Sequence, residues 1–242
     1  MAKNDKRIDC DNGCTHKKTI TFTDKLENAF SGLVESYISI FNKKFIPTRD
    51  EIGFTERNLT FYFCQSYIKG NPNAIVWQEM PIKDENQHLD SILLDFDEKE
   101  EYIHVCLIES KRIYNEHYVG IKVQNNKCSI MEPQPEHGTL VKDYKRLNKI
   151  INGNNKECEI PGLKDFEKYK NKKIRFHVVQ LASLEHKKNN YQSTVEKRMN
   201  SMEYFISTKN FTKSIVKSID LSEKSNDYEK LYLYMLADPQ LE

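Results

Sequence analysis

The chain has 242 residues, enough for a sizeable hydrophobic core, and 38% of them are hydrophobic while 30% are charged. The net charge of +1 gives no global sign of a nucleic-acid partner, and no apolar run reaches the length of a signal peptide or a membrane span. These features favour a cytoplasmic globular protein whose six cysteines are reduced thiols.

Residues 1–18 are polar and are predicted to form a poorly ordered tail, before a single domain over residues 19–242. The tail contains Cys10, Cys14 and His16, but no second ligand pair at zinc-site spacing follows, so we interpret them as incidental. A long helix is then predicted over residues 24–45. Its inward side chains should be Leu26, Phe30, Leu33, Tyr37 and Phe41.

A second helix is predicted to begin after Thr55 as its N-cap and to end before the turn at residues 70–73. A strand is predicted over residues 74–80, and Pro81 ends it. Two further strands follow, so the expected order is helix, strand, strand, strand.

These two strands are predicted to form one β-hairpin, with arms at residues 88–96 and 102–111 joined by an all-charged turn. Facing residues in an antiparallel pair have a constant index sum. A turn centred between Lys99 and Glu100 therefore places Asp90 opposite Glu109. Both arms carry apolar residues on both faces, which is typical of a central strand that is buried on two sides.

Two facing carboxylates destabilise a sheet unless a cation neutralises them. Side chains alternate along a strand, so Glu109 and Lys111 point the same way and converge with Asp90. Mg²⁺ binds one or two carboxylates together with waters and phosphates, and an adjacent lysine can orient a water for in-line attack at phosphorus. The set predicts phosphodiester hydrolysis. The alternative is a surface hairpin in which Glu109 and Lys111 pair with each other.

Asp90 on one strand and Glu109-Ser110-Lys111 on the next resemble the signature of the PD-(D/E)XK nuclease superfamily, with Leu89 in place of the proline before the aspartate. The resemblance covers residues 55 to 150. It implies an α/β fold with a restriction-endonuclease-like αβββαβ core, in which helices flank a mixed central sheet, here with extra N- and C-terminal helices. It also implies that Asp90, Glu109 and the Ser110 carbonyl bind Mg²⁺ or Mn²⁺, and that Lys111 positions or activates the attacking water.

In this superfamily the helix before the sheet often supplies another acidic residue, and by resemblance Glu56 is the best match for it. The helix dipole alone also favours a glutamate in the first helical turn, so this interpretation has a purely structural alternative. Glu79, at the end of the preceding strand, is a weaker candidate because it could simply be solvated.

After Lys111 the chain is expected to be irregular until a helix at residues 139–151, where Lys142, Lys145 and Arg146 lie off the apolar stripe. These three are candidate phosphate contacts, although a solvated, lysine-rich helix face is the commoner explanation for such residues. A strand at residues 173–181, an amphipathic helix marked by Val195, Met199, Met202 and Ile206, and a last helix at residues 228–237 are predicted to follow.

Acidic residues dominate positions 79–110 and basic residues dominate positions 142–217, a layout that suits a nuclease. The chain is therefore predicted to be a metal-dependent DNA endonuclease of restriction or genome defence, with no membrane partner. A non-catalytic nucleic-acid-binding or assembly subunit and an RNase are the alternatives. Many members of the superfamily act as dimers, which leaves a homodimer open. No G-x-G-x-x-G or Walker loop is present, so a nucleotide-driven function would need a separate partner subunit.

Overall fold

The computed structural model describes residues 20–43, 55–81, 88–96, 101–124, 127–131, 138–152, 172–189, 191–209 and 211–239. The predicted tail with Cys10, Cys14 and His16 lies outside these ranges, as does most of the charged turn at residues 97–101.

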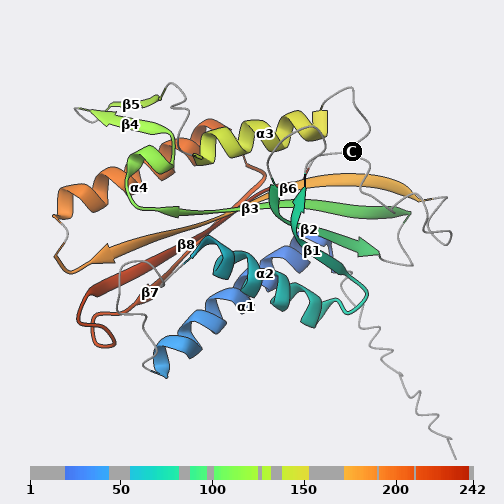
Figure 1. Cartoon of the computed structure of the whole chain (residues 1–242), viewed down its shortest axis with the longest axis horizontal. Helices are drawn as coiled ribbons and strands as arrows, with labels where there is room; N and C mark the ends of the chain where they lie inside the picture. Colours follow the sequence, from blue (N-terminus) through green and yellow to red (C-terminus); the bar gives the residue numbers. More distant parts are fainter. Residues whose placement is uncertain are drawn as a thin grey trace, which may run out of the picture.

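A six-stranded sheet forms the centre of the fold, with strand order β1-β2-β3-β6-β8-β7 (Figure 1). Its strands are β1 (Ile75–Pro81), β2 (His88–Phe96), β3 (Tyr102–Ile113), β6 (Lys173–Lys187), β7 (Lys213–Asp220) and β8 (Tyr228–Pro239). The β3–β6 pair is parallel and every other neighbouring pair is antiparallel. The predicted α/β class with a mixed central sheet is confirmed.

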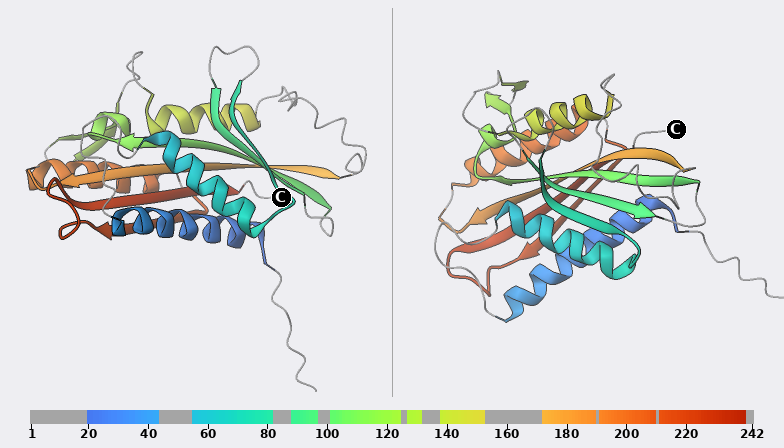
Figure 2. Two further views of the ribbon diagram at one scale, coloured as in Figure 1. Left: turned by 60° about the horizontal axis from the view of Figure 1, so that its bottom comes forward. Right: turned by 45° about the vertical axis from the view of Figure 1, so that its right-hand side comes forward.

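Helices cover both faces of this sheet. In Figures 1 and 2, α1 (Phe22–Asn42) and α2 (Glu56–Gly70) lie on one face, and α3 (Leu140–Asn152) and α4 (Gln192–Lys209) lie on the other. Between α1 and α4 the larger elements follow in the order α2, β1, β2, β3, α3 and β6, with small elements between β3 and α3.

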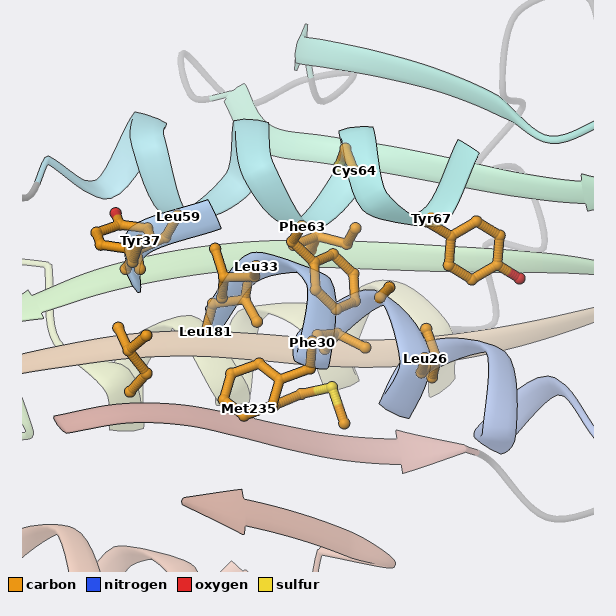
Figure 3. Close-up of a cluster of buried hydrophobic side chains, with 14 of the residues drawn as sticks. Leu26, Phe30, Leu33, Tyr37, Leu59, Phe63, Cys64, Tyr67, Leu181 and Met235 are labelled. Carbon is orange, nitrogen blue, oxygen red and sulfur yellow. The ribbon is translucent and has the colours of Figure 1, made fainter. Parts of the chain in front are cut away.

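The N-terminal helices form as the sequence predicts. Thr21 and Asp24 make a reciprocal capping box at the start of α1, and the Thr55 side chain accepts a hydrogen bond from the Asn58 amide at the start of α2. The predicted inward side chains of α1 are all buried. They pack with α2 and with the sheet in one hydrophobic cluster, where Phe30, Phe63 and Met235 meet (Figure 3).

The β2–β3 hairpin has the predicted register. Ser91 faces Ile108 and Ile92 faces Leu107, and both pairs have the index sum that places Asp90 opposite Glu109 at the next position. Nearly all residues of β3 are buried, with Cys106 and Ile108 against α1 and α2 and Val105 and Leu107 on the opposite face. This agrees with a central strand that is covered on both sides.

The predicted C-terminal helix at residues 228–237 is wrong. The segment is strand β8, paired with β6 on one side and β7 on the other. Leu231, Tyr232 and Met235 recur at helical spacing, but Leu231, Leu233 and Met235 alternate into the cluster beneath α1 while Tyr234 and Leu236 pack on the face of α4. Burial on both faces of the sheet outweighs the helical pattern.

The stretch expected to be irregular contains a short 3₁₀ turn, η1 (Glu116–Tyr118), and a small antiparallel hairpin of β4 (Ile121–Gln124) and β5 (Lys127–Ile130). Strand β7 was also not predicted. The helix at residues 139–151 and the amphipathic helix with Val195 and Met202 are confirmed as α3 and α4. None of the helices described is long and apolar enough to cross a membrane.

Candidate active site

Glu109, Ser110 and Lys111 lie near the C-terminal end of strand β3, in a largely buried environment. Glu109 is 5% exposed, and its carboxylate forms an ion pair with Arg146 of α3. Lys111 contacts two other carboxylates, with its Nζ 3.6 Å from Glu56 Oε1 and 3.5 Å from Asp143 Oδ2. The site is therefore not a surface hairpin in which Glu109 and Lys111 pair with each other.

Asp90 lies where the β2–β3 ladder ends. Beyond Ser91 no further residue of β2 is paired with β3, and Asp90 Oδ2 instead accepts a hydrogen bond of 2.7 Å from the Ser110 amide. The aspartate thus lies beside the Glu109-Ser110-Lys111 segment, as the predicted register requires.

Glu56 reaches the same segment from the first turn of α2. Its Oε1 accepts a hydrogen bond of 3.0 Å from the Arg112 amide and lies near Lys111 Nζ. The carboxylates of Asp90 and Glu56 therefore accept hydrogen bonds from the Ser110 and Arg112 amides of β3, which have no partner on β2. Both carboxylates thus have a structural role as well as an electrostatic one. Glu56 belongs to the site geometrically.

Asp143 and Arg146 of α3 also belong to this cluster of charged side chains. The sequence did not predict that either residue contacts Glu109 or Lys111. Asp143 is 7% exposed and lies 3.5 Å from Lys111 and 3.9 Å from Arg146, while Arg146 contacts Glu109. The signal for Asp143 was its position on the apolar stripe of the helix, between Leu140 and Leu147. A charged residue on a buried stripe needs a partner, and here the partner is Lys111.

The two facing carboxyl groups both bind protons more tightly than usual. Burial raises the pKa of Asp90 to about 6, with further upward contributions from Glu56 and Asp143 that the Ser110 amide and Lys111 oppose. Burial and the neighbouring Asp90 raise the pKa of Glu109 to about 9, and Arg146 does not offset them. Ionisation of both groups would place two buried negative charges side by side, and a bound cation would stabilise that ionised form.

Lys111 remains an ammonium group in this site. Burial lowers its pKa, but the surrounding carboxylates, led by Asp143 and Glu56, outweigh burial and raise it overall. A lysine held in the charged form acts by stabilising negative charge and by donating hydrogen bonds, and not by abstracting a proton. Gly138 lies beside it, and a Cβ there would be 3.3 Å from Lys111 Nζ.

The remaining candidates lie outside the cluster or play other parts. The Ser110 hydroxyl faces away from it and forms a short hydrogen bond with Thr60 of α2. Glu79, which has a positive φ of 53°, is exposed and pairs with Arg57. Lys142 and Lys145 are exposed on α3, where their predicted phosphate contacts stay predictions.

A divalent metal ion has a limited set of donors here. Within the described ranges, no group of three or more His, Cys, Asp and Glu side chains is arranged to hold a metal. Mg²⁺, however, is commonly held by one or two carboxylates, with waters and substrate phosphates as its other ligands. The facing Asp90 and Glu109, whose pKa values are raised by burial and by neighbouring carboxylates, fit that requirement. Any ion on Glu109 would share that carboxylate with Arg146.

Comparison with known proteins adds no identification: no protein-family model, no curated protein and no solved structure matches this chain.

Replacing Glu56 by glutamine tests its electrostatic role, because the amide oxygen can still accept the hydrogen bond of the Arg112 amide. We expect Glu56→Gln to lower any phosphodiesterase rate less than Asp90→Asn does, since Asp143 still holds Lys111. Initial rates of both variants on one substrate give the comparison. Wild-type activity in Glu56→Gln would leave this residue with only its structural role, and a complete loss would place it among the essential ligands.

Loss of the proton that folded Glu109 retains should make the metal-free protein less stable at high pH. The unfolded carboxyl group ionises near its ordinary pKa of 4.5, whereas the folded one retains its proton up to about pH 9. This stabilisation is complete below pH 4.5 and is lost as the pH rises through 9.

Urea unfolding in EDTA should therefore show wild type losing stability relative to Glu109→Gln between pH 5 and 9, by at most about 1.4 kcal/mol per pH unit. The comparison with the glutamine variant removes the contributions of titrating groups that do not interact with Glu109. A difference that is flat with pH would mean that Arg146 keeps Glu109 ionised throughout.

Proposed function

We propose that this protein is a metal-dependent nuclease of the PD-(D/E)XK type that hydrolyses phosphodiester bonds in DNA. One observation carries the proposal: Asp90, Glu109 and Lys111, which resemble the superfamily's signature, converge from two adjacent strands on one buried site. Glu56 joins them from the helix that precedes the sheet. A role in restriction or genome defence follows from the resemblance alone.

The order of elements supports the same proposal. The helix α2, strands β1 to β3, helix α3 and strand β6 occur in the αβββαβ order of the superfamily's core. The signature residues lie on the second and third of these strands, as they do in the family's pattern. By this proposal, α1, α4, β7, β8 and the β4–β5 hairpin are additions around the core.

In such a reaction the carboxylates and the lysine of the cluster would have different tasks. Asp90 and Glu109 would hold Mg²⁺, which would polarise the phosphate and lower the pKa of a bound water. Lys111, as an ammonium group, would orient the attacking water and stabilise the negative charge that develops on the phosphorane oxygens. Glu56 and Asp143 fix the position of Lys111 through their contacts with Nζ.

A non-catalytic nucleic-acid-binding subunit is the second candidate, and a specific observation favours it. The chain's own cations already form ion pairs within the cluster, with Arg146 on Glu109 and Lys111 between Glu56 and Asp143. Such an internally paired cluster can serve folding alone. An RNase would use the same residues and the same chemistry as the DNase.

One assay separates these candidates. The purified protein is incubated with plasmid, linear duplex, single-stranded DNA and RNA, each with Mg²⁺, with Mn²⁺ and with EDTA. Asp90→Asn protein, purified in parallel, controls for contaminating nucleases. Metal-dependent cleavage of DNA that the variant lacks supports the proposal, and cleavage of RNA alone would assign an RNase. Binding without cleavage under every condition would favour the non-catalytic subunit.

A further inference from the structure

Trp77 is the one tryptophan of the chain, and it is strongly exposed. It lies on β1, which is an edge strand of the sheet, and 58% of its surface is accessible. Its neighbour Ile75, two residues away on the same face of the strand, is also exposed. A large aromatic side chain that folding leaves uncovered is available to a ligand.

The strand register places Trp77 on the face of the sheet that carries the candidate site. Trp77 pairs with Ile92 and Ile75 with Leu94, and facing residues of an antiparallel pair share a face. Ile92 and Leu94 pack in one cluster with Leu147 of α3, whereas Val76 packs on the opposite face against the cluster of α1 and α2. The indole is therefore on the side of α3, as Glu109 and Arg146 are.

The separation between Trp77 and Asp90 is similar to the spacing of neighbouring nucleotides in a nucleic-acid strand. Ile92, which faces Trp77, is two residues from Asp90 on the same strand, or about 7 Å along it, and the backbone of Trp77 lies about 5 Å across on the next strand, so the two backbone positions are about 8 Å apart. Successive phosphates of a nucleic-acid strand are about as far apart. A strand with one phosphate at Asp90 and Glu109 thus brings a neighbouring nucleotide to Trp77.

We infer that Trp77 is a stacking platform for a nucleobase of the substrate strand, next to the phosphate that lies at the site. The inference rests on the proposed function. A ring can stack on the face of a base only where that base is not enclosed in a duplex, so the favoured substrate has an unpaired base at this position. Stacking on an aromatic ring requires no particular base, so the contact adds affinity without sequence preference.

Because Trp77 is the chain's one tryptophan, its fluorescence reports directly on this contact. We would titrate wild-type protein in EDTA with a 12-nucleotide oligo(dT) and with a 12-base-pair duplex of mixed sequence. The single strand should quench the fluorescence saturably, and the duplex should quench it less at equal occupancy. Occupancy is measured separately by the anisotropy of labelled DNA.

The matched variants are Trp77→Leu, Trp77→Phe and Tyr191→Leu. Tyr191 is a highly exposed aromatic residue at the start of α4, and so controls for the loss of any surface ring. Trp77→Leu should weaken binding of labelled oligo(dT) by about 5- to 150-fold, the range for one base stacked on an aromatic ring. Trp77→Phe should recover part of this loss, and Tyr191→Leu should bind as wild type does.

An unchanged affinity of Trp77→Leu for oligo(dT), with no quenching in wild type, would overturn the inference. So would a change of oligomeric state in Trp77→Leu by light scattering without a change in DNA affinity, since a second copy of the chain would then cover the indole. Failure of the proposed function looks different. Quenching and weaker binding in Trp77→Leu, with no cleavage of any substrate in Mg²⁺, would retain the stacking platform and discard the nuclease.

Discussion

Replacing Lys111 by alanine should reduce cleavage by about 10²- to 10³-fold or more, because the ammonium group stabilises charge that appears only in the transition state. Its raised pKa keeps it charged over the range in which such enzymes operate. Affinity for DNA should change only a few-fold, since we expect exposed basic groups, with Lys142 and Lys145 as the candidates, to provide the contacts with the phosphate backbone. Single-turnover rates in Mg²⁺ and gel shifts in EDTA measure the two quantities separately.

The control for this prediction is a variant that removes the same charge elsewhere. Lys197 is exposed on α4, a different helix from the two that contribute to the cluster, so Lys197→Ala should cleave at the wild-type rate. Lys111→Ala also leaves Glu56 and Asp143 without their shared cation, so its unfolding must be checked at the assay temperature. A folded Lys111→Ala protein that turns over normally would remove Lys111 from the reaction.

The core hairpin could be predicted because its information is local. Two apolar arms and a short charged turn fix the register of β2 against β3, and the register fixes which carboxylates face each other. The C-terminal strand could not be predicted in this way. The segment from Tyr228 to Ala237 satisfies both a helical and an alternating pattern, and its pairing partners, β6 and β7, decide between them. The β4–β5 hairpin has only four residues in each strand, too few for a reliable periodicity.

The candidate site also has a part that local sequence predicts and a part that depends on tertiary packing. Asp90, Glu109 and Lys111 follow from strand alternation and register, which the sequence contains. Asp143 and Arg146 depend on how α3 is rotated above β3 and β6, and that rotation results from the packing of Leu140, Val141 and Leu147. A basic residue in a lysine-rich helix gives no sign that it, unlike its neighbours, is turned inward. The sequence therefore predicts the part of the site on the hairpin, and tertiary packing adds the part on the helix.

Removing the charge of Asp90 should stabilise the metal-free protein. Burial raises the pKa of this carboxyl group from 3.8 to about 6, so its ionisation at pH 7.5 costs the folded state up to about 3 kcal/mol. Asparagine lacks the charge, and its amide oxygen can still accept the hydrogen bond from the Ser110 amide. In EDTA at pH 7.5, Asp90→Asn should melt at the wild-type temperature or higher, at about 2–4 °C for each kcal/mol gained.

Metal should offset most of this difference. Mg²⁺ or Mn²⁺ at 100 times its dissociation constant would stabilise wild type by about 2.7 kcal/mol, because the ion binds only the folded state. Asp90→Asn has lost one of the two facing carboxylates and should scarcely respond. Melting curves of both proteins in EDTA, Mg²⁺ and Mn²⁺ measure the effect of the substitution and the response of each protein to metal. If Asp90→Asn is clearly destabilised in EDTA and the wild type is indifferent to metal, Asp90 serves the Ser110 amide alone and the two facing carboxylates are not a metal site.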